Sequence, residues 1–190
     1  MSTSAATTTT SSKNNNSEPS PQEGDVMFGK FIIPEASVFY RSPLSSYAFV
    51  NLRPLVPGHV LVIPHDRVAT MAELSEEAYL DMWKTVRVVQ SMLKQHYKDT
   101  TAFNVAIQDG RAAGQSVPHV HVHILPRQDG DYERNDDIYT DLETWAPREE
   151  LKVETKLQVP EDNERRDRTR QEMADEAAVY RAILEEEKTS

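Results

Sequence analysis

Three histidines, His119, His121 and His123, alternate with apolar residues over 119–125. Side chains two residues apart on a β-strand point to the same side. The three imidazoles are therefore expected to form one row, with neighbours about 6.6 Å apart, while the valines and isoleucine between them face the core. A row of adjacent imidazoles offers nucleophilic, proton-transfer and metal-binding chemistry.

Three interpretations of this row follow from its chemistry. The first is purely structural: the histidines are partly buried side chains whose hydrogen bonds are satisfied. This interpretation is the weakest, because three such histidines share one face. A metal site is the second, because His-x-His on a strand supplies two zinc ligands. The outer pair lies roughly 13 Å apart, so an ion would need two neighbours and a further ligand such as His59 or His65. In the third, neutral imidazole attacks phosphorus to give a phosphoramidate that water cleaves, and the central His121 is the expected nucleophile.

A loop with two glycines precedes the histidines. Gly110 and Gly114 give backbone freedom, and Gln115, Ser116 and Val117 lead into the expected strand. Consecutive N–H groups in such a loop can bind anions, and the serine hydroxyl and glutamine amide add neutral donors. The sequence contains neither of the common glycine motifs for mononucleotides and dinucleotides. The loop and the row together favour phosphate chemistry over metal binding.

Composition excludes several other classes of function. The 190 residues carry a net charge of −10 with a pI near 5.1, and no cluster of Lys and Arg marks a surface for a nucleic-acid backbone. Cysteine is absent, which excludes disulfides and thiolate chemistry and fits an intracellular protein. No apolar run suits a membrane span, and the N-terminus lacks the apolar segment of a signal peptide. We expect a cytoplasmic location, with the nucleus left open as a second one.

A mainly antiparallel sheet must position the histidines. Ser75, followed by two glutamates, begins a helix expected over about 75–98. The fold class is therefore α+β, with a β-meander, one long helix and two further strands. The expected strands lie near 28–33, 38–40, 47–52, 59–63 and 102–107, before the histidine strand that ends at Pro126.

Three segments of different character make up the chain. Residues 1–25 are rich in Ser, Thr and Asn and are expected to be disordered. Residues 26–140 form the folded domain, in which the acidic run at 129–137 is interpreted as a long surface segment. Residues 141–190 are interpreted as an acidic linker and a C-terminal helix within about 162–187. The apolar face of that helix is sparse, which predicts weak packing.

Residues 114–123, with sequence GQSVPHVHVH, resemble the signature of the histidine triad superfamily. The chain is most similar to the fragile histidine triad branch of dinucleoside polyphosphate hydrolases, and the resemblance covers roughly 27–140. It is carried further by Gln108-Asp109-Gly110, by Leu125-Pro126-Arg127 and by the segments at 28–29, 50–51, 57–62 and 134–139. Pro118 departs from the pattern and removes one backbone donor.

The resemblance implies a histidine-triad-like α+β protomer that forms a homodimer with a continuous sheet. It also implies hydrolysis of diadenosine triphosphate to AMP and ADP, with His121 transiently adenylylated. His123 and Gln108 would contact the α-phosphate, while His59 and His119 would orient the other rings. The further substrate contacts that it implies are Asn51 at the ribose, Gly114, Gln115, Ser116 and Val117 around the phosphates, and Phe28, Phe31 and Ile33 at the adenine.

Structural alternatives and two rival functions stay open at this point. Asn51 also fits a strand-end turn, Gln108 a strand cap, and the apolar side chains a core. One rival is a nucleoside phosphoramidase of the same superfamily, although Gln108 and the Pro126-Arg127 ending favour the hydrolase. The other is a nucleotide-binding signalling module, whose output is the bound complex. No bound cofactor or metal is expected, but Mg²⁺ or Mn²⁺ is expected to accompany the substrate, because an acidic chain offers few cations to neutralise polyphosphate.

Overall fold

The computed structural model describes residues 20–143 and 166–189, so most of the expected N-terminal tail and acidic linker lies outside the described residues. Five antiparallel strands form the main sheet in the order β3-β4-β5-β7-β6, and a hairpin pairs two further strands. The strands of the main sheet are β3 (Val38–Arg41), β4 (Ser46–Val50), β5 (Val60–Pro64), β7 (Val122–Arg127) and β6 (Ala102–Ala106). The hairpin strands are β1 (Val26–Phe28) and β2 (Phe31–Ile33), and the α-helices of the described residues are α1 (Glu76–His96), α2 (Asp137–Glu143) and α3 (Arg170–Thr189). The α+β class with a mainly antiparallel sheet is confirmed.

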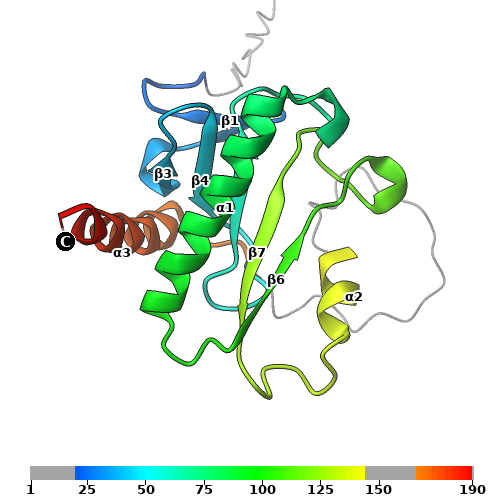
Figure 1. Cartoon of the computed structure of the whole chain (residues 1–190), viewed down its shortest axis with the longest axis vertical. Coiled ribbons are helices and arrows are strands. Elements are labelled where there is room, and N and C mark those ends of the chain that lie inside the picture. Colours follow the sequence, from blue (N-terminus) through cyan, green and yellow to red (C-terminus); the bar gives the residue numbers. More distant parts are fainter. Residues whose placement is uncertain (1–19, 144–165, 190) are drawn as a thin grey trace, which may run out of the picture.

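The two faces of the sheet have different coverings. Helices α1 and α3 pack on one face, where Val60, Val62 and Ile124 belong to the main core (Figure 1). Leu61, between the two valines, belongs instead to a second core with the β1–β2 hairpin, as expected for alternating side chains. Helix α2 packs over Leu125 in a third cluster. The face opposite α1 and α3 is therefore the one available to the histidines.

Helix α1 begins and ends close to the predicted residues. The Ser75 hydroxyl accepts a hydrogen bond from the N–H of Ala78 at 3.1 Å, which caps the helix as its sequence predicts. Met82, Val89 and Leu93 are fully buried against the sheet. The spacing of apolar side chains thus identified both the helix and its buried face.

Helix α3 packs more tightly than its sparse apolar face predicted. Met173, Ala177, Tyr180 and Leu184 are all buried in the main core. Tyr180 is among the largest fully buried side chains, and its ring lies edge-on to Phe39 with centroids 5.1 Å apart. The expectation of weak packing is wrong, because one large aromatic side chain fills the space that several smaller ones would otherwise occupy.

Three local expectations are corrected by the structure. The segment 28–33 is the turn and second half of a hairpin, because Gly29 has φ +56° and reverses the chain. The acidic run at 129–137 is mostly exposed, as expected of a surface segment, but it leads into α2, which the sequence analysis missed. The histidine strand begins at Val122, three residues later than expected. Before it, the N–H of His119 donates to the Val117 carbonyl at 2.7 Å within a turn, and that of Val120 donates to the Val68 carbonyl at 2.9 Å in a distant loop, so neither donor pairs with a neighbouring strand.

Candidate active site

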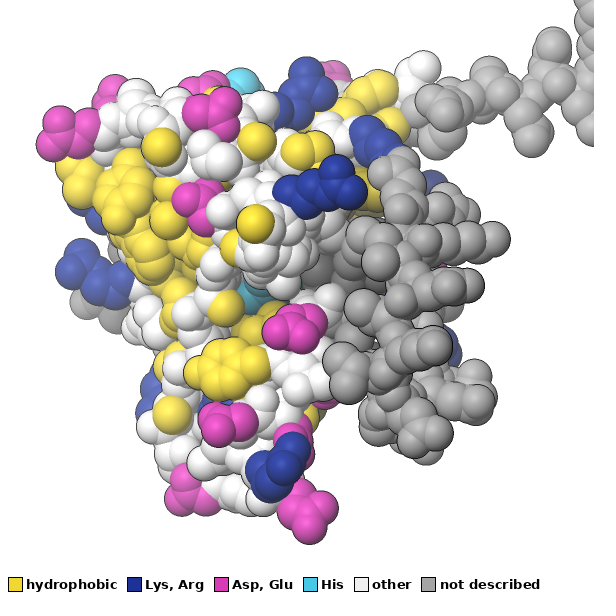
Figure 2. All heavy atoms as spheres, turned by 90° about the vertical axis from the view of Figure 1, so that its right-hand side faces the viewer, with side chains coloured by type: hydrophobic (Ala, Val, Ile, Leu, Met, Phe, Trp, Pro, Cys, Tyr) yellow, Lys and Arg dark blue, Asp and Glu magenta, His cyan; other side chains and the backbone are white. Residues whose placement is uncertain are grey.

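Four imidazoles lie together on the face of the sheet opposite α1 and α3. His59, His119, His121 and His123 are each fully buried. The ring of His123 lies 5.0 Å from that of His121 and 5.2 Å from that of His59, measured between centroids. On the face seen in Figure 2, a histidine side chain is visible in a recess bordered by hydrophobic side chains. The structure thus brings together all four histidines to which the resemblance assigns a role.

Main-chain groups set the tautomers of the first two triad histidines. Nδ1 of His121 lies 2.7 Å from the carbonyl oxygen of His119, so this nitrogen carries the proton and donates. The lone pair of His121 is therefore on Nε2. In His119 the arrangement is reversed: Nδ1 accepts from the N–H of Gly29 at 3.1 Å, and Nε2 donates to the carbonyl of Pro64 at 2.9 Å. His119 is an orienting ring with both nitrogens engaged.

A chain of hydrogen bonds sets the tautomers of the other two. The N–H of Leu55 donates to Nδ1 of His59 at 3.1 Å, so a neutral His59 carries its proton on Nε2. That Nε2 lies 2.9 Å from Nδ1 of His123 and donates to it. His123 must then carry its own proton on Nε2. The arrangement presents a lone pair on His121 beside an N–H donor on His123.

Burial keeps these rings uncharged. It is the largest cause that lowers the pKa of His59 to about 3 and that of His121 to about 4. For His123, burial and then the neighbouring His59 and His121 lower the pKa well below 6.5. The pKa of His119 is also lowered, chiefly by burial. Near neutral pH the His121 ring is therefore the neutral form that a nucleophile requires.

The loop before the triad has the tight form that its glycines predict. Gly114 has φ +87°, and a Cβ at this position would meet Nε2 of Gln108 at 2.9 Å, so the Gln108 amide packs directly on the glycine. The Gln115 amide donates to the Ala69 carbonyl at 2.7 Å and ties the loop to the preceding segment. The Ser116 hydroxyl is buried and has no partner within the described residues. Val117 is buried in the second core, where its side chain packs on the hairpin.

Of the residues expected to contact the nucleoside, Asn51 and Phe28 are buried beside the histidines, whereas Phe31 and Ile33 lie on the outer strand of the hairpin. Asn51 is buried directly after β4. Its amide nitrogen lies over the His59 ring, 3.2 Å from Nε2 and 3.4 Å from Nδ1, and its oxygen accepts from the N–H of Arg53. Asn51 therefore makes the strand-end turn that the structural alternative expected, and its side chain also contacts a histidine of the site. Phe28 is buried with its ring 5.0 Å from that of His121, whereas Phe31 is 37% exposed at the hairpin and Ile33 packs at the edge of the second core.

The metal interpretation finds no ligand set in residues 20–143 and 166–189. Among them, no group of three or more His, Asp or Glu side chains converges as in a metal site. His65, one of the ligands that the sequence offered, has a side chain 65% exposed at the surface.

Residues 20–143 and 166–189 contain no helix that is long and apolar enough to cross a membrane.

Sequence reasoning missed the groups that fix the rings. Gly29, Leu55 and Pro64 act through their main chain, which residue type does not predict. Arg168 was missed as well, although its charge is second only to burial in lowering the pKa of His59. The fold brings it there from a distant part of the chain, so no local pattern could reveal it.

A family model described as the HIT domain matches residues 34–130 of this chain, a region that contains the triad, the preceding loop and Asn51. The chain belongs to the HIT domain family. A relative from Arabidopsis thaliana, named bifunctional bis(5'-adenosyl)-triphosphatase/adenylylsulfatase FHIT, is 46% identical over 83% of each chain. A bis(5'-adenosyl)-triphosphatase from Dictyostelium discoideum is 36% identical over 85% of this chain and 94% of its own.

Solved structures of HIT proteins share the fold. Diadenosine triphosphate hydrolase from Plasmodium falciparum, in complex with cyclomarin A, aligns with a TM-score of 0.64 at 27% identity, over 92% of this chain and 90% of its own. The NitFhit protein of C. elegans aligns with the same score at 34% identity, over 86% of this chain but 31% of its own. The histidine-triad-like fold expected from the resemblance is therefore confirmed.

Proposed function

We propose that this HIT protein hydrolyses diadenosine triphosphate to AMP and ADP through an adenylylated His121. The observation that carries the proposal is the pairing of tautomers, with a lone pair on Nε2 of His121 and an N–H on Nε2 of the adjacent His123. Relatives over most of the chain are named for this hydrolysis, which supports the choice of substrate.

In the first step, Nε2 of His121 attacks the α-phosphorus. A P–N bond forms and the bond from phosphorus to the bridging oxygen breaks, so that ADP leaves with the electron pair of that oxygen. The imidazole keeps its Nδ1 proton and becomes positively charged, and the carbonyl of His119 accepts from that N–H at 2.7 Å throughout. His123 donates its Nε2 proton in a hydrogen bond to an α-phosphate oxygen as charge develops there.

In the second step, water attacks the same phosphorus. The P–N bond breaks, its electron pair returns to Nε2 of His121, and AMP leaves with the oxygen of water. One proton of the attacking water is released to solvent, and the His121 ring regains its neutral form with its proton on Nδ1. The buried Ser116 hydroxyl is a neutral donor for the phosphate in both steps.

Trapping the intermediate tests the mechanism. Diadenosine triphosphate labelled in the adenosine is mixed with the protein and quenched within milliseconds under mild alkali. Label bound through an acid-labile bond is expected in the wild type and absent from His121→Asn, whose turnover falls at least about 10³-fold. His65→Asn, at a surface side chain that is 65% exposed, is the control and keeps the label. An unlabelled wild-type protein that still turns over would contradict the nucleophile.

Substrate comparison separates the rival functions. Turnover of diadenosine triphosphate should exceed that of an adenosine phosphoramidate; the opposite order would favour the phosphoramidase. Diadenosine tetraphosphate is a third arm, because a relative from Schizosaccharomyces pombe, 39% identical over 84% of this chain and 94% of its own, is named bis(5'-nucleosyl)-tetraphosphatase. If the cellular role survives His121→Asn with binding intact, the bound complex is the output.

Three further parts of the proposal concern the assembly, the metal and the location. We propose a homodimer built at β6, because this strand is one of the two edge strands of the main sheet and Val105 on it is 36% exposed. Mg²⁺ or Mn²⁺ is proposed to enter with the polyphosphate, so a chelator should lower turnover and leave the unfolding midpoint unchanged.

The proposed location of the protein is the cytoplasm. A fluorescent fusion in cells tests this location and shows whether the nucleus is included.

A further inference from the structure

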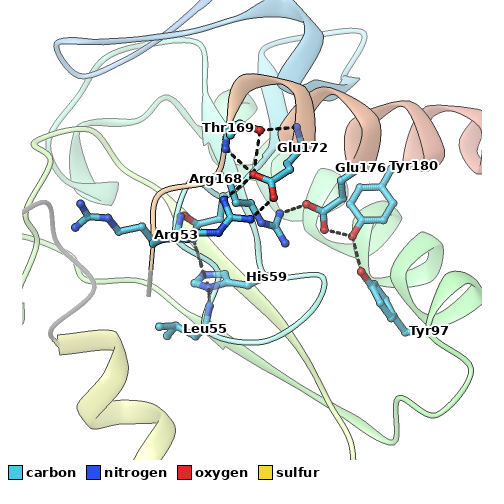
Figure 3. Close-up of polar contacts among 11 residues, drawn as sticks. Arg53, Leu55, His59, Tyr97, Arg168, Thr169, Glu172, Glu176 and Tyr180 are labelled. Carbon is cyan, nitrogen blue, oxygen red and sulfur yellow. Dashed lines mark hydrogen bonds and ion pairs between the residues drawn. The ribbon is translucent and has the colours of Figure 1, made fainter. Parts of the chain in front are cut away.

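Arg168 connects the segment before α3 to the turn after β4. Its main-chain N–H donates to the carbonyl of Leu52 at 3.0 Å. The preceding residue, Asp167, forms an ion pair with Arg53. Both contacts are made to the turn that also contacts the ring of His59 (Figure 3). The segment before α3 therefore lies directly behind one of the four site histidines.

The guanidinium of Arg168 is held from the side of α3. It forms an ion pair with one oxygen of Glu176, and the other oxygen accepts from the Tyr180 hydroxyl at 2.6 Å. The Tyr180 hydroxyl is in turn 2.9 Å from that of Tyr97, at the end of α1 (Figure 3). The side chains of the ion pair are only 22% and 15% exposed. This chain of contacts gives the cation a fixed position between the helices and the site.

The charges around His59 come from three parts of the fold. Arg168 provides a positive charge from the segment before α3, and its guanidinium is paired with the carboxylate of Glu176 on α3. From the β7 side, His121 adds repulsion when protonated, and His123 accepts a hydrogen bond. Burial first, then Arg168, disfavours the charged imidazole. A neutral His59 keeps the tautomer that donates to His123.

We propose that Arg168 is a positioning residue of the active site, which holds the turn after β4 and maintains His59 as a hydrogen-bond donor to His123. The inference deepens the proposed function and rests on it, because His123 matters through its contact with the α-phosphate. Arg168 lies outside residues 34–130, the region matched by the HIT model. The catalytic geometry of this chain would then extend beyond its family domain into the C-terminal segment.

The ring tautomers in the full chain without substrate test this placement. Nitrogen-15 NMR of the histidine rings near pH 7.5, where the neutral rings cost the fold no stability, reports which nitrogen of His59 carries the proton. The wild type should hold it on Nε2, Arg168→Gln should show exchange between the two tautomers, and Arg168→Lys should stay near the wild type. Arg166→Gln is the matched control, because Arg166 forms a similar ion pair with Glu172 in the first turn of α3 but its side chain is 69% exposed. An unchanged tautomer in Arg168→Gln, or an equal change in the control, overturns the proposal.

Turnover of diadenosine triphosphate gives the second measurement. Arg168→Gln should lower kcat about tenfold with little change in KM. Arg168→Lys should restore most of the kcat and the wild-type tautomer of His59. A change in KM alone, with the tautomer unmoved, would mean that Arg168 has only a structural role and would refute the proposal.

Failure of the inference can be told apart from failure of the proposed function. The NMR measurement uses no substrate, so it judges the placement of Arg168 even if the wild type does not cleave diadenosine triphosphate. If Arg168→Gln does not fold, the double variant Arg168→Leu/Glu176→Leu removes both charges of the partly buried pair and is expected to fold. The two tautomers of His59 should exchange in it as well, and a wild-type tautomer there would count against Arg168.

Discussion

At the scale of residues, the chemistry of the four imidazoles depends on which nitrogen carries the proton. Identical side chains take opposite roles: His121 donates through Nδ1 to a carbonyl, whereas His119 accepts at Nδ1 from the N–H of Gly29. The alternation of histidines in the sequence predicted the nucleophile and its neighbours. It could not predict the tautomers, because these are set by main-chain groups of other elements.

A pair of glycine substitutions isolates the contact between the loop and Gln108. Gly114 is in the left-handed region, with φ +87° and ψ 9°, whereas Gly110, with φ +94° and ψ 165°, is in a region that only glycine adopts readily, so alanine strains the backbone at both and more at Gly110. Only at Gly114 does the new Cβ meet Gln108, at 2.9 Å. We expect both variants to lose stability in urea unfolding, Gly110→Ala the more, and only Gly114→Ala to lose kcat, by about tenfold.

Gly110→Ala is the matched control in this comparison, since nothing lies within 4 Å of its added Cβ. Equal losses of kcat in the two variants would mean that backbone strain alone accounts for the effect. A fully active Gly114→Ala would remove Gln108 from the substrate contacts of the site.

At the scale of elements, strand β6 has the features of an interface. It pairs with β7 on one side only, within the described residues, and Val105 is 36% exposed on it. Val105→Arg should introduce charge repulsion across a dimer built on this edge and shift the mass in light scattering from about twice 21.6 kDa toward one chain. Val179→Arg, at a valine 44% exposed on α3, should leave the mass unchanged. A wild-type monomer, or a dimer that survives Val105→Arg, contradicts the β6 interface.

The elements that the sequence predicted well are those whose signals are local. Helix α1 followed from its cap at Ser75, and β4 and β5 from apolar runs. The histidine strand was placed three residues too early, because the N–H of Val120 pairs with the carbonyl of Val68 in a distant loop, which periodicity does not reveal. The packing of α3 was underestimated, because it depends on the single side chain of Tyr180. Non-local contacts account for both errors.

At the scale of the whole molecule, an acidic protein encloses a site for a polyanion. The net charge is −10, yet the donors nearest the expected phosphate are neutral: the N–H of His123 and the Ser116 hydroxyl. A cationic imidazole would attract the substrate but would lose the lone pair that attacks it. The partly exposed Arg168 cation, which is paired with Glu176, is second to burial in disfavouring a protonated His59. Nucleophilic attack and neutralisation of the substrate charge are thus expected to be carried by different groups.

Burial of the four neutral histidines should make folding sensitive to mild acid. Their pKa values are lowered in the folded protein, whereas an unfolded histidine titrates near 6.5. Below about pH 6.5 the unfolded chain therefore binds protons that the folded chain excludes. The contribution of the neutral rings to the free energy of unfolding is fully present above that pH. It is lost as the pH falls toward 4, by about 1.4 kcal/mol per pH unit for each ring that stays neutral.

Urea unfolding between pH 7.5 and pH 5 measures this slope before most carboxylates titrate. The pKa of Asp131, which pairs with Arg127, is lowered, so that pair remains ionised across the range. His121→Asn removes one excluded proton and should reduce the slope by about 1.4 kcal/mol per pH unit. A wild-type free energy of unfolding that stays constant over this range would mean that the rings accept protons in the folded state, and the neutral nucleophile would then lack its physical basis.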